Sequence, residues 1–131
     1  MVQEIAMNAA PLSNSPAGKA FAAIDRLKTL QTGWDSYDAD PPDPFALTYA
    51  KEFLTEIMQA LGSSFANPIV GPTAESGVAL VWRKKGQGEV DAFFSPAGGR
   101  YVVIGSDRKL AGQIKDYRSF AVEILKPFMS Q

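Results

Sequence analysis

The chain has 131 residues, of which 46% are hydrophobic and 21% charged, and its formal net charge is −1. This length suits one domain with a single core, and so small a net charge gives no general attraction to nucleic acid or to an anionic membrane. Because cysteine and histidine are both missing from the sequence, it excludes disulfides, thiolate nucleophiles, Cys/His zinc sites and histidine-based acid–base catalysis.

Residues 1–15 have the composition of a flexible arm. Asparagines, serines and Pro11 interrupt any hydrophobic period, and little apolar surface is present to order the segment. It lacks the basic and apolar regions of a secretory signal, and no stretch of the chain reaches the ~20 apolar residues that a transmembrane helix needs. We therefore expect a flexible arm over residues 1–15 and a single domain over residues 16–131, located in the cytoplasm.

Two amphipathic helices are expected in the first half of the chain. Over residues 16–31 apolar side chains recur every third position, and Gly33 supplies a left-handed residue to end the helix. The second helix has Asp43 as its N-cap, Pro44 in the first helical position and Gly62 directly after its last apolar residue. These signals define the second helix more sharply than the first.

The second half of the chain changes to a β pattern. Three runs, GVALVWRKK, EVDAFFS and RYVVIGS, are separated by glycine-rich turns and predict an antiparallel meander. Residues 68–72 begin and end with proline and could add a short edge strand. A polar stretch around SDRKLAGQ leads to a last helix that Asp116 caps and Pro127 cuts short. The predicted α+β fold has two N-terminal helices, a three- to four-stranded antiparallel meander and one C-terminal helix, with the helices packed on one face of the sheet.

Alternation along the strands assigns the two faces of this sheet. On the run at 77–83 the alternate larger side chains, ending at Trp82, are the better candidates for the core, and on the next run Glu89 and Asp91 should face water. The outer face then carries Ala79, Val81 and Phe93. Because this face is more apolar than a lone monomer needs, we predict that it binds a partner or a second copy.

The segment GWDSYDADPPDP, residues 33–44, joins the two helices and contains four aspartates without a basic residue. Two interpretations stay open. As a structural link it would end one helix and start the next through Gly33, Trp34, Tyr37, Asp43 and Pro44. As a binding element it would present acidic side chains to a basic partner surface; these are Asp35, Asp38 and Asp40. The spacing does not fit an EF-hand loop, so we predict no bound metal.

The remaining motifs do not predict catalysis or nucleic-acid binding. Glu52 and Glu56 share the polar face of the second helix, where nothing would desolvate them. The basic cluster at 83–85 lies next to sheet aromatics, but neither an RNP signature nor a phosphate-binding glycine loop is present. A Gly-x-Ser-x-Gly nucleophile elbow is also missing from the sequence.

The GWDSYDADPPDP segment, the helix after it and the later ESGVALVW resemble a group of small uncharacterised bacterial proteins. In that group a GWD-x-Y-x-A-like link with prolines precedes a long helix, and a strand near G-(I/V)-x-L-x-W follows. The resemblance covers roughly residues 25–105 and supports the predicted order of elements. Since the group has no assigned activity, the resemblance implies no mechanism.

We therefore expect a non-enzymatic interaction module, without a cofactor, that binds and modulates or inhibits a protein partner. The acidic link and the outer sheet face together would form its binding surface. Small inhibitors carried by phages or mobile elements, aimed at bacterial defence or at a nucleic-acid-handling complex, fit this description. One alternative is a small-ligand or carbohydrate-processing protein, which would need a pocket with two carboxylates beside Trp82 or Tyr101. Another is a structural homo-oligomer, such as a homodimer, that buries the outer face.

Overall fold

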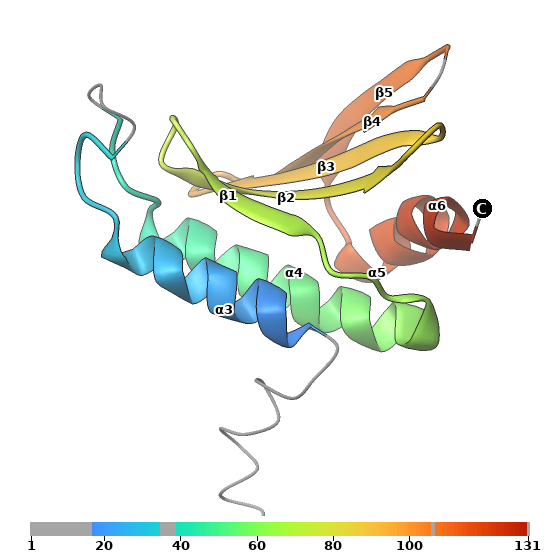
Figure 1. Cartoon of the computed structure of the whole chain (residues 1–131), viewed down its shortest axis with the longest axis horizontal. Helices are drawn as coiled ribbons and strands as arrows, with labels where there is room; N and C mark the ends of the chain where they lie inside the picture. The colour runs from blue at the N-terminus through green and yellow to red at the C-terminus, as the bar shows by residue number, and fades with distance from the viewer. Residues whose placement is uncertain (1–16, 35–38, 106, 131) are drawn as a thin grey trace, which may run out of the picture.

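A five-stranded antiparallel sheet with helices on one face makes up the part of the chain that the computed structural model describes, residues 17–34, 39–105 and 107–130 (Figure 1). The strands lie side by side in chain order: β1 (Ile69–Thr73), β2 (Gly77–Lys84), β3 (Gly88–Ser95), β4 (Gly98–Ile104) and β5 (Lys109–Ile114). The helices are α3 (Gly18–Arg26), α4 (Pro44–Leu61), α5 (Tyr117–Phe120) and α6 (Lys126–Ser130). Short turns of other helix types follow three of them: η1 (Leu27–Thr29), η2 (Gly62–Ser64) and η3 (Ala121–Leu125). The predicted α+β class is confirmed, and the short edge strand is present as β1.

The fifth strand corrects the predicted count of three or four. The sequence interpretation treated the residues around SDRKLAGQ as a polar connection, whereas β5 pairs with β4 from Ile104↔Lys109 to Gly99↔Ile114. Its alternation is weak, because the inward positions of β5 include Gly112 between the two larger apolar residues at 110 and 114. A polar edge strand with a central glycine carries little β propensity, so its strand character depends on the register with β4.

Helix α4 begins and ends where the sequence signals place it. The Asp43 side chain accepts a hydrogen bond from the Phe45 backbone N–H at 2.8 Å, and Pro44 occupies the first helical position. At the other end Gly62 adopts a φ of 54°, which a residue with a side chain rarely tolerates. These caps satisfy or replace the unpaired backbone groups at the two ends of the helix.

The other two helices differ from prediction in their boundaries. Helix α3 and its 3₁₀ extension end at Thr29, so Gly33, with a φ of 84°, lies in the following link and does not end the helix. Pro127 does not cut the C-terminal helix short either, since the helix continues through α6 to Ser130. The π-helical turn η3 precedes Pro127. Proline has no N–H and its ring clashes with the carbonyl four residues earlier in an α-helix, and the longer hydrogen-bond spacing of a π-helical turn leaves room for it.

The core lies between the inner face of the sheet and the helices. Phe53 on α4 is fully buried at its centre, with ring centroids 4.8 Å from Phe94 and 6.2 Å from Trp82 on the sheet. The same ring lies 5.4 Å from Tyr117 and 5.7 Å from Phe120 on α5. One aromatic cluster thus joins α4, the sheet and the C-terminal helix, and it leaves the opposite face of the sheet without a helix in the part of the chain described (Figure 1).

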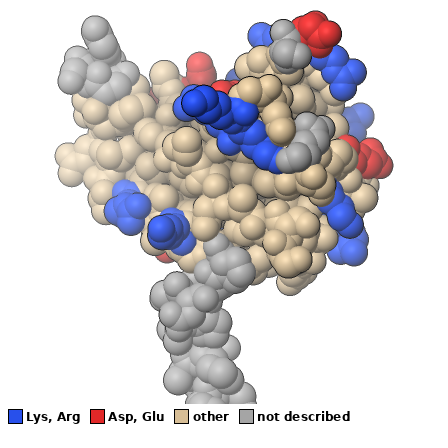
Figure 2. All heavy atoms as spheres, turned by 45° about the vertical axis from the view of Figure 1, so that its right-hand side comes forward, with Lys and Arg blue, Asp and Glu red and all other residues tan. Residues whose placement is uncertain are grey.

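Charge is distributed unevenly over this framework. Residues 1–65 contain four Lys/Arg against eight Asp/Glu, whereas residues 66–131 contain nine against six. The face turned forward in Figure 2, which includes the right-hand end of the sheet in Figure 1, shows more Lys and Arg than Asp and Glu. The face in Figure 2 therefore presents a mainly basic surface to a partner.

Candidate functional site

The outer face of the sheet carries a cross-strand row that is apolar except at its centre. The register places one residue of each strand in this row, in the order Ile69, Val81, Asp91, Val102 and Ala111. The end residue Ile69 is 60% exposed, and Ile104, on the same face and two residues beyond Val102 on β4, is 39% exposed. Val81 and Val102 are half-buried, because their own neighbours across the strands cover part of each side chain.

Asp91 is the unusual member of this row. Its Oδ1 atom is inaccessible to solvent and has no hydrogen-bond partner within the described ranges. Burial between apolar neighbours raises the pKa of Asp91 to about 7, and the adjacent Glu89 carboxylate adds to that rise. A carboxyl group of this kind is ionised only in part near neutral pH, and its charged form lacks the donors that normally stabilise it.

Glu89 and Arg83 flank Asp91 on the same face. The Arg83 Nε–H donates to Glu89 Oε1 at 2.7 Å across the β2–β3 pair. The pKa of Glu89 is lowered, mainly by a hydrogen bond with the Asp91 carboxyl. The hydrogen bond from the Arg83 guanidinium is the second largest cause. The pKa of Arg83 is raised in turn by Glu89. The three groups form one electrostatic cluster, in which Arg83 pairs with Glu89 and leaves one Asp91 oxygen without a donor.

Phe93, two residues along the same strand, extends the surface toward the β1–β2 turn. It lies opposite Ala79 on one side and Arg100 on the other, and the Arg100 guanidinium carbon is 4.8 Å from the centre of the Phe93 ring. A shallow hollow of about 240 Å³ beside this pair is lined also by Thr73 and Glu75. The structure therefore places the three predicted sheet residues, Ala79, Val81 and Phe93, together on one face.

The link between α3 and α4 reaches this end of the sheet. The Asp43 backbone N–H donates to the Ser76 carbonyl in the β1–β2 turn at 2.8 Å. Within the link, the Gly33 N–H donates to the Ala39 carbonyl at 2.9 Å, and the Trp34 indole N–H donates to the Asp40 carbonyl at 2.8 Å. Asp40 itself is exposed. Asp35, Tyr37 and Asp38 lie outside the described residues.

The hydrogen bonds of Trp34 change its predicted role. The sequence predicted that Gly33 and Trp34 would together end the first helix. Instead, Gly33 and Trp34 bond within the link itself, and Trp34 remains partly exposed. The two residues therefore close a loop and do not cap a helix.

Sequence reasoning missed the role of Asp91, which it assigned only to the water-facing side of its strand. The available signal was Asp91 itself, the second acidic residue of EVDAFFS, which lies among apolar positions of the neighbouring runs. That signal required the register, because only the pairing of Asp91 with Val81 and with Val102 shows that its neighbours desolvate it.

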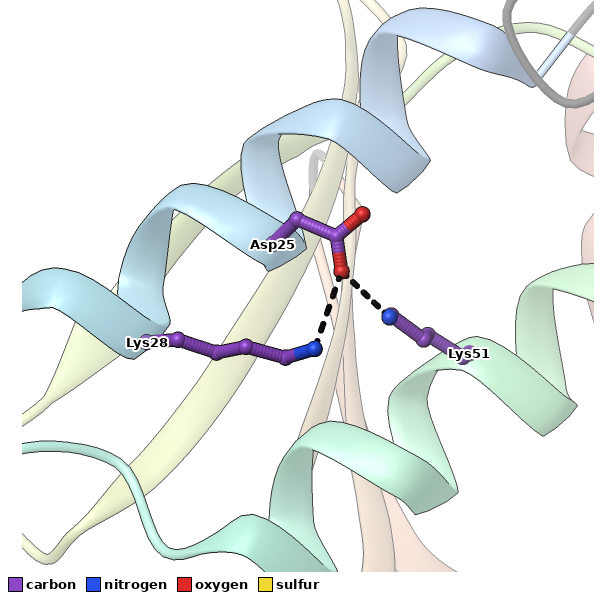
Figure 3. Close-up of polar contacts among 3 residues, drawn as sticks. All are labelled: Asp25, Lys28 and Lys51. Atoms are coloured by element: carbon purple, nitrogen blue, oxygen red, sulfur yellow. Dashed lines mark ion pairs between the residues drawn. The ribbon is translucent and has the colours of Figure 1, made fainter. Parts of the chain in front are cut away.

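The remaining clusters offer less chemistry. In Figure 3 the Asp25 carboxylate lies between Lys28, at 3.5 Å, and Lys51, which joins α3 to α4, and these lysines lower the pKa of Asp25, Lys51 most strongly. We interpret this exposed pair as a helix–helix contact. Trp82 and Tyr101 face the core side, where Trp82 donates to the Ala66 carbonyl at 2.8 Å. Within the described ranges, acidic side chains do not gather into a metal site.

Comparison of the chain with protein-family models, with curated proteins and with solved structures gave no match. No helix among the described residues combines the length and the apolar character needed to cross a membrane. The chain's own surface chemistry is therefore the basis for inferring its function.

Proposed function

We propose that this protein is an interaction module that binds a protein partner through the outer face of its sheet. The observation that supports the proposal is the apolar cross-strand row with Asp91 at its centre. Antiparallel sheets commonly expose one face to water, but that face is then lined mainly with polar side chains. Here the exposed face keeps Ile69, Val81 and Val102, as a binding surface would.

The chemistry of Asp91 suggests what the partner contributes. A partner that covers the row with apolar side chains would bury the carboxyl further, at a cost unless it also supplies a donor. A lysine or arginine at the centre of the partner surface would supply a donor to the Asp91 carboxyl and would draw that group into its ionised form. The partner that fits best is therefore an apolar surface with a central cation.

The acidic link extends this surface. The hydrogen bond between Asp43 and Ser76 holds the end of the link against the β1–β2 turn, and exposed Asp40 and Glu75 add negative charge there. These charges would steer a basic partner toward the outer face and contribute more to association rate than to affinity. Regulation or inhibition of the partner would follow if the covered region includes the partner's own working surface.

The test uses affinity capture from the native cell lysate, with nuclease, followed by titration of the purified partner. We expect a near-stoichiometric protein to be captured by the wild-type chain and lost when Val81→Asn and Phe93→Ser are combined. The matched control is Val122→Asn, which changes an equally apolar, 45% exposed side chain on the C-terminal helix. Capture by the control but not by the double variant supports the outer face, whereas equal capture by both removes it.

Titration at several pH values tests the proposed cation. Because the partner's cation would favour ionised Asp91, binding to the wild type should strengthen as pH rises through about 7, while Asp91→Asn should flatten that dependence. Binding that weakens over the same range would indicate a purely apolar partner surface. Asp40→Lys tests the link separately, and an unchanged association rate would remove the link from the proposal.

The same variants separate the alternative of self-association. If the outer face joins two copies of this chain, the wild type will sediment as a dimer on its own, and the double variant will sediment as a monomer. That result would show that the outer face binds a second copy of this chain and not a different protein. A wild-type monomer that captures a different protein through the outer face supports the proposal.

A further inference from the structure

We propose that the free edge of β5 binds an extended segment of a partner protein whose side chains alternate between acidic and apolar. This site lies beyond the outer-face surface proposed above and does not depend on it. An incoming strand would pair with β5 and lengthen the sheet, which is an established way for a domain to hold a peptide.

The register of β5 determines which of its backbone groups remain available. The Gly105 N–H donates to the Arg108 carbonyl at 2.8 Å and closes the β4–β5 turn. Bonded and non-bonded pairs alternate from there, so Leu110 and Gly112 exchange hydrogen bonds with β4. The alternate residues of β5 turn their N–H and C=O groups away from the sheet, and all three are exposed; they are Lys109, Ala111 and Gln113.

The opposite edge of the sheet is protected by comparison. Strand β1 has five residues, includes Pro72, which has no N–H to donate, and packs against α3. Such features commonly prevent pairing with a further strand. Within the described ranges β5 carries no proline, Figure 1 shows no helix along its outer edge, and its main protection is the charge of Lys109.

The charge around β5 specifies an acidic occupant. Arg108, Lys109, Lys115 and Arg118 are all exposed along the strand and its continuation. Two acidic residues lie in the same stretch, Asp107 and Asp116, and the Asp116 carboxylate accepts the Ser119 N–H at 2.9 Å as the cap of α5. The edge therefore has net positive charge, which favours an acidic strand and opposes pairing with a second β5.

The two sides of the edge explain the alternation. On the outer side the next strand would face Lys109 and Gln113, which suit acidic side chains. On the inner side it would face Leu110, which is 45% exposed, and Ile114. A hollow of about 210 Å³ adjoins Leu110, between β4, β5 and the C-terminal helix, and a second of about 580 Å³ adjoins Ile114. Apolar side chains of the added strand would extend toward these two hollows.

The experiment titrates the full chain with a short synthetic peptide of alternating Glu and Val. We expect binding with new protection from hydrogen exchange at the amides of Lys109, Ala111 and Gln113, while Leu110 and Gly112 are protected already. A peptide of alternating Lys and Val should bind about tenfold more weakly or not at all, because its charges oppose those of the edge. The Glu/Val peptide with alternate N-methyl groups should also fail, because it lacks the donors for pairing.

A matched pair of variants at position 111 makes the test specific. Ala111→Pro removes one outward N–H without touching a bond to β4, and should weaken peptide binding about tenfold, whereas Ala111→Ser should bind as the wild type does. Unchanged thermal unfolding would show that the Pro variant is folded. The proposal is overturned if the Glu/Val peptide does not bind, if N-methylation has no effect, or if the protected amides lie elsewhere. Dimerisation of the wild type through this edge would also overturn it.

Discussion

The two faces of the sheet differ in how their apolar residues are used. On the inner face Val78, Leu80 and Val90 have no solvent exposure, because α4 and the C-terminal helix cover them. On the outer face Val81 and Val102 remain half-buried, and Asp91 lies between them. The same strands thus supply a finished core on one side and an apolar, partly charged surface on the other. Packing against the helices therefore accounts for the apolar residues of the inner face and not for those of the outer face.

The difference between the two faces should appear most strongly when one phenylalanine at each face is truncated to alanine. Phe53→Ala removes a fully buried ring that contacts four other aromatic residues, and should lower the free energy of unfolding by about 3–5 kcal/mol. Phe93→Ala removes a half-buried ring on the outer face and its contact with Arg100, and should cost less than about 1 kcal/mol. Urea unfolding measures both, and similar losses would show that the outer face is also part of the core.

A pair of glycines tests the same difference with smaller substitutions. A Cβ atom on Gly99 would lie 2.8 Å from Cε1 of Phe94, a buried ring with little freedom to move, whereas nothing lies within 4 Å of a Cβ on Gly71. Gly99→Ala should therefore destabilise by about 1–3 kcal/mol, and Gly71→Ala should change stability by less than about 0.5 kcal/mol. Thermal unfolding of the two variants decides this. A large effect at Gly71 would mean that the outer face is tightly packed after all.

Much of the fold could be predicted from the sequence because its strongest signals are local. Asp43, Pro44 and Gly62 act within a few residues, and they set the bounds of α4 correctly. Strand β5 could not be predicted this way, since it exists through its pairing with β4. Pro127 was wrongly predicted to end the last helix because the sequence did not indicate the π-helical turn that precedes it and accommodates it.

The candidate site could be predicted only in outline. Alternation placed Val81 and Phe93 on the outer face, as the register does. The environment of Asp91 could not be predicted, because the residues that desolvate it come from β2 and β4 and not from its own strand. The raised pKa of Asp91 therefore depends on three paired strands, whereas the face toward which it points follows from alternation along its own strand alone.

Asp91 gives the most selective test of the comparison, through the pH dependence of stability. Its pKa is about 7 in the folded chain against an ordinary value of 3.8, so the folded state binds a proton that the unfolded state has released. Stability should therefore fall as pH rises from about 4 to about 7 and stay low above that range. Asp91→Asn removes this loss. We expect the variant to gain about 1–2 kcal/mol over the wild type near pH 8, after allowance for solvent screening, and little near pH 4.

Urea unfolding of both proteins across this pH range makes the measurement, with Asp107→Asn as the control for removal of an exposed carboxylate. A gain that grows with pH in Asp91→Asn alone would show that the outer face holds an ionised carboxyl at a cost to the fold. A flat difference would mean that water already solvates Asp91 fully. The first result would also explain how the outer face can bind a partner. A cation from the partner would stabilise ionised Asp91 and so recover the free energy that the isolated chain loses there. Inner-face residues such as Val90 are covered already and have no such free energy to recover.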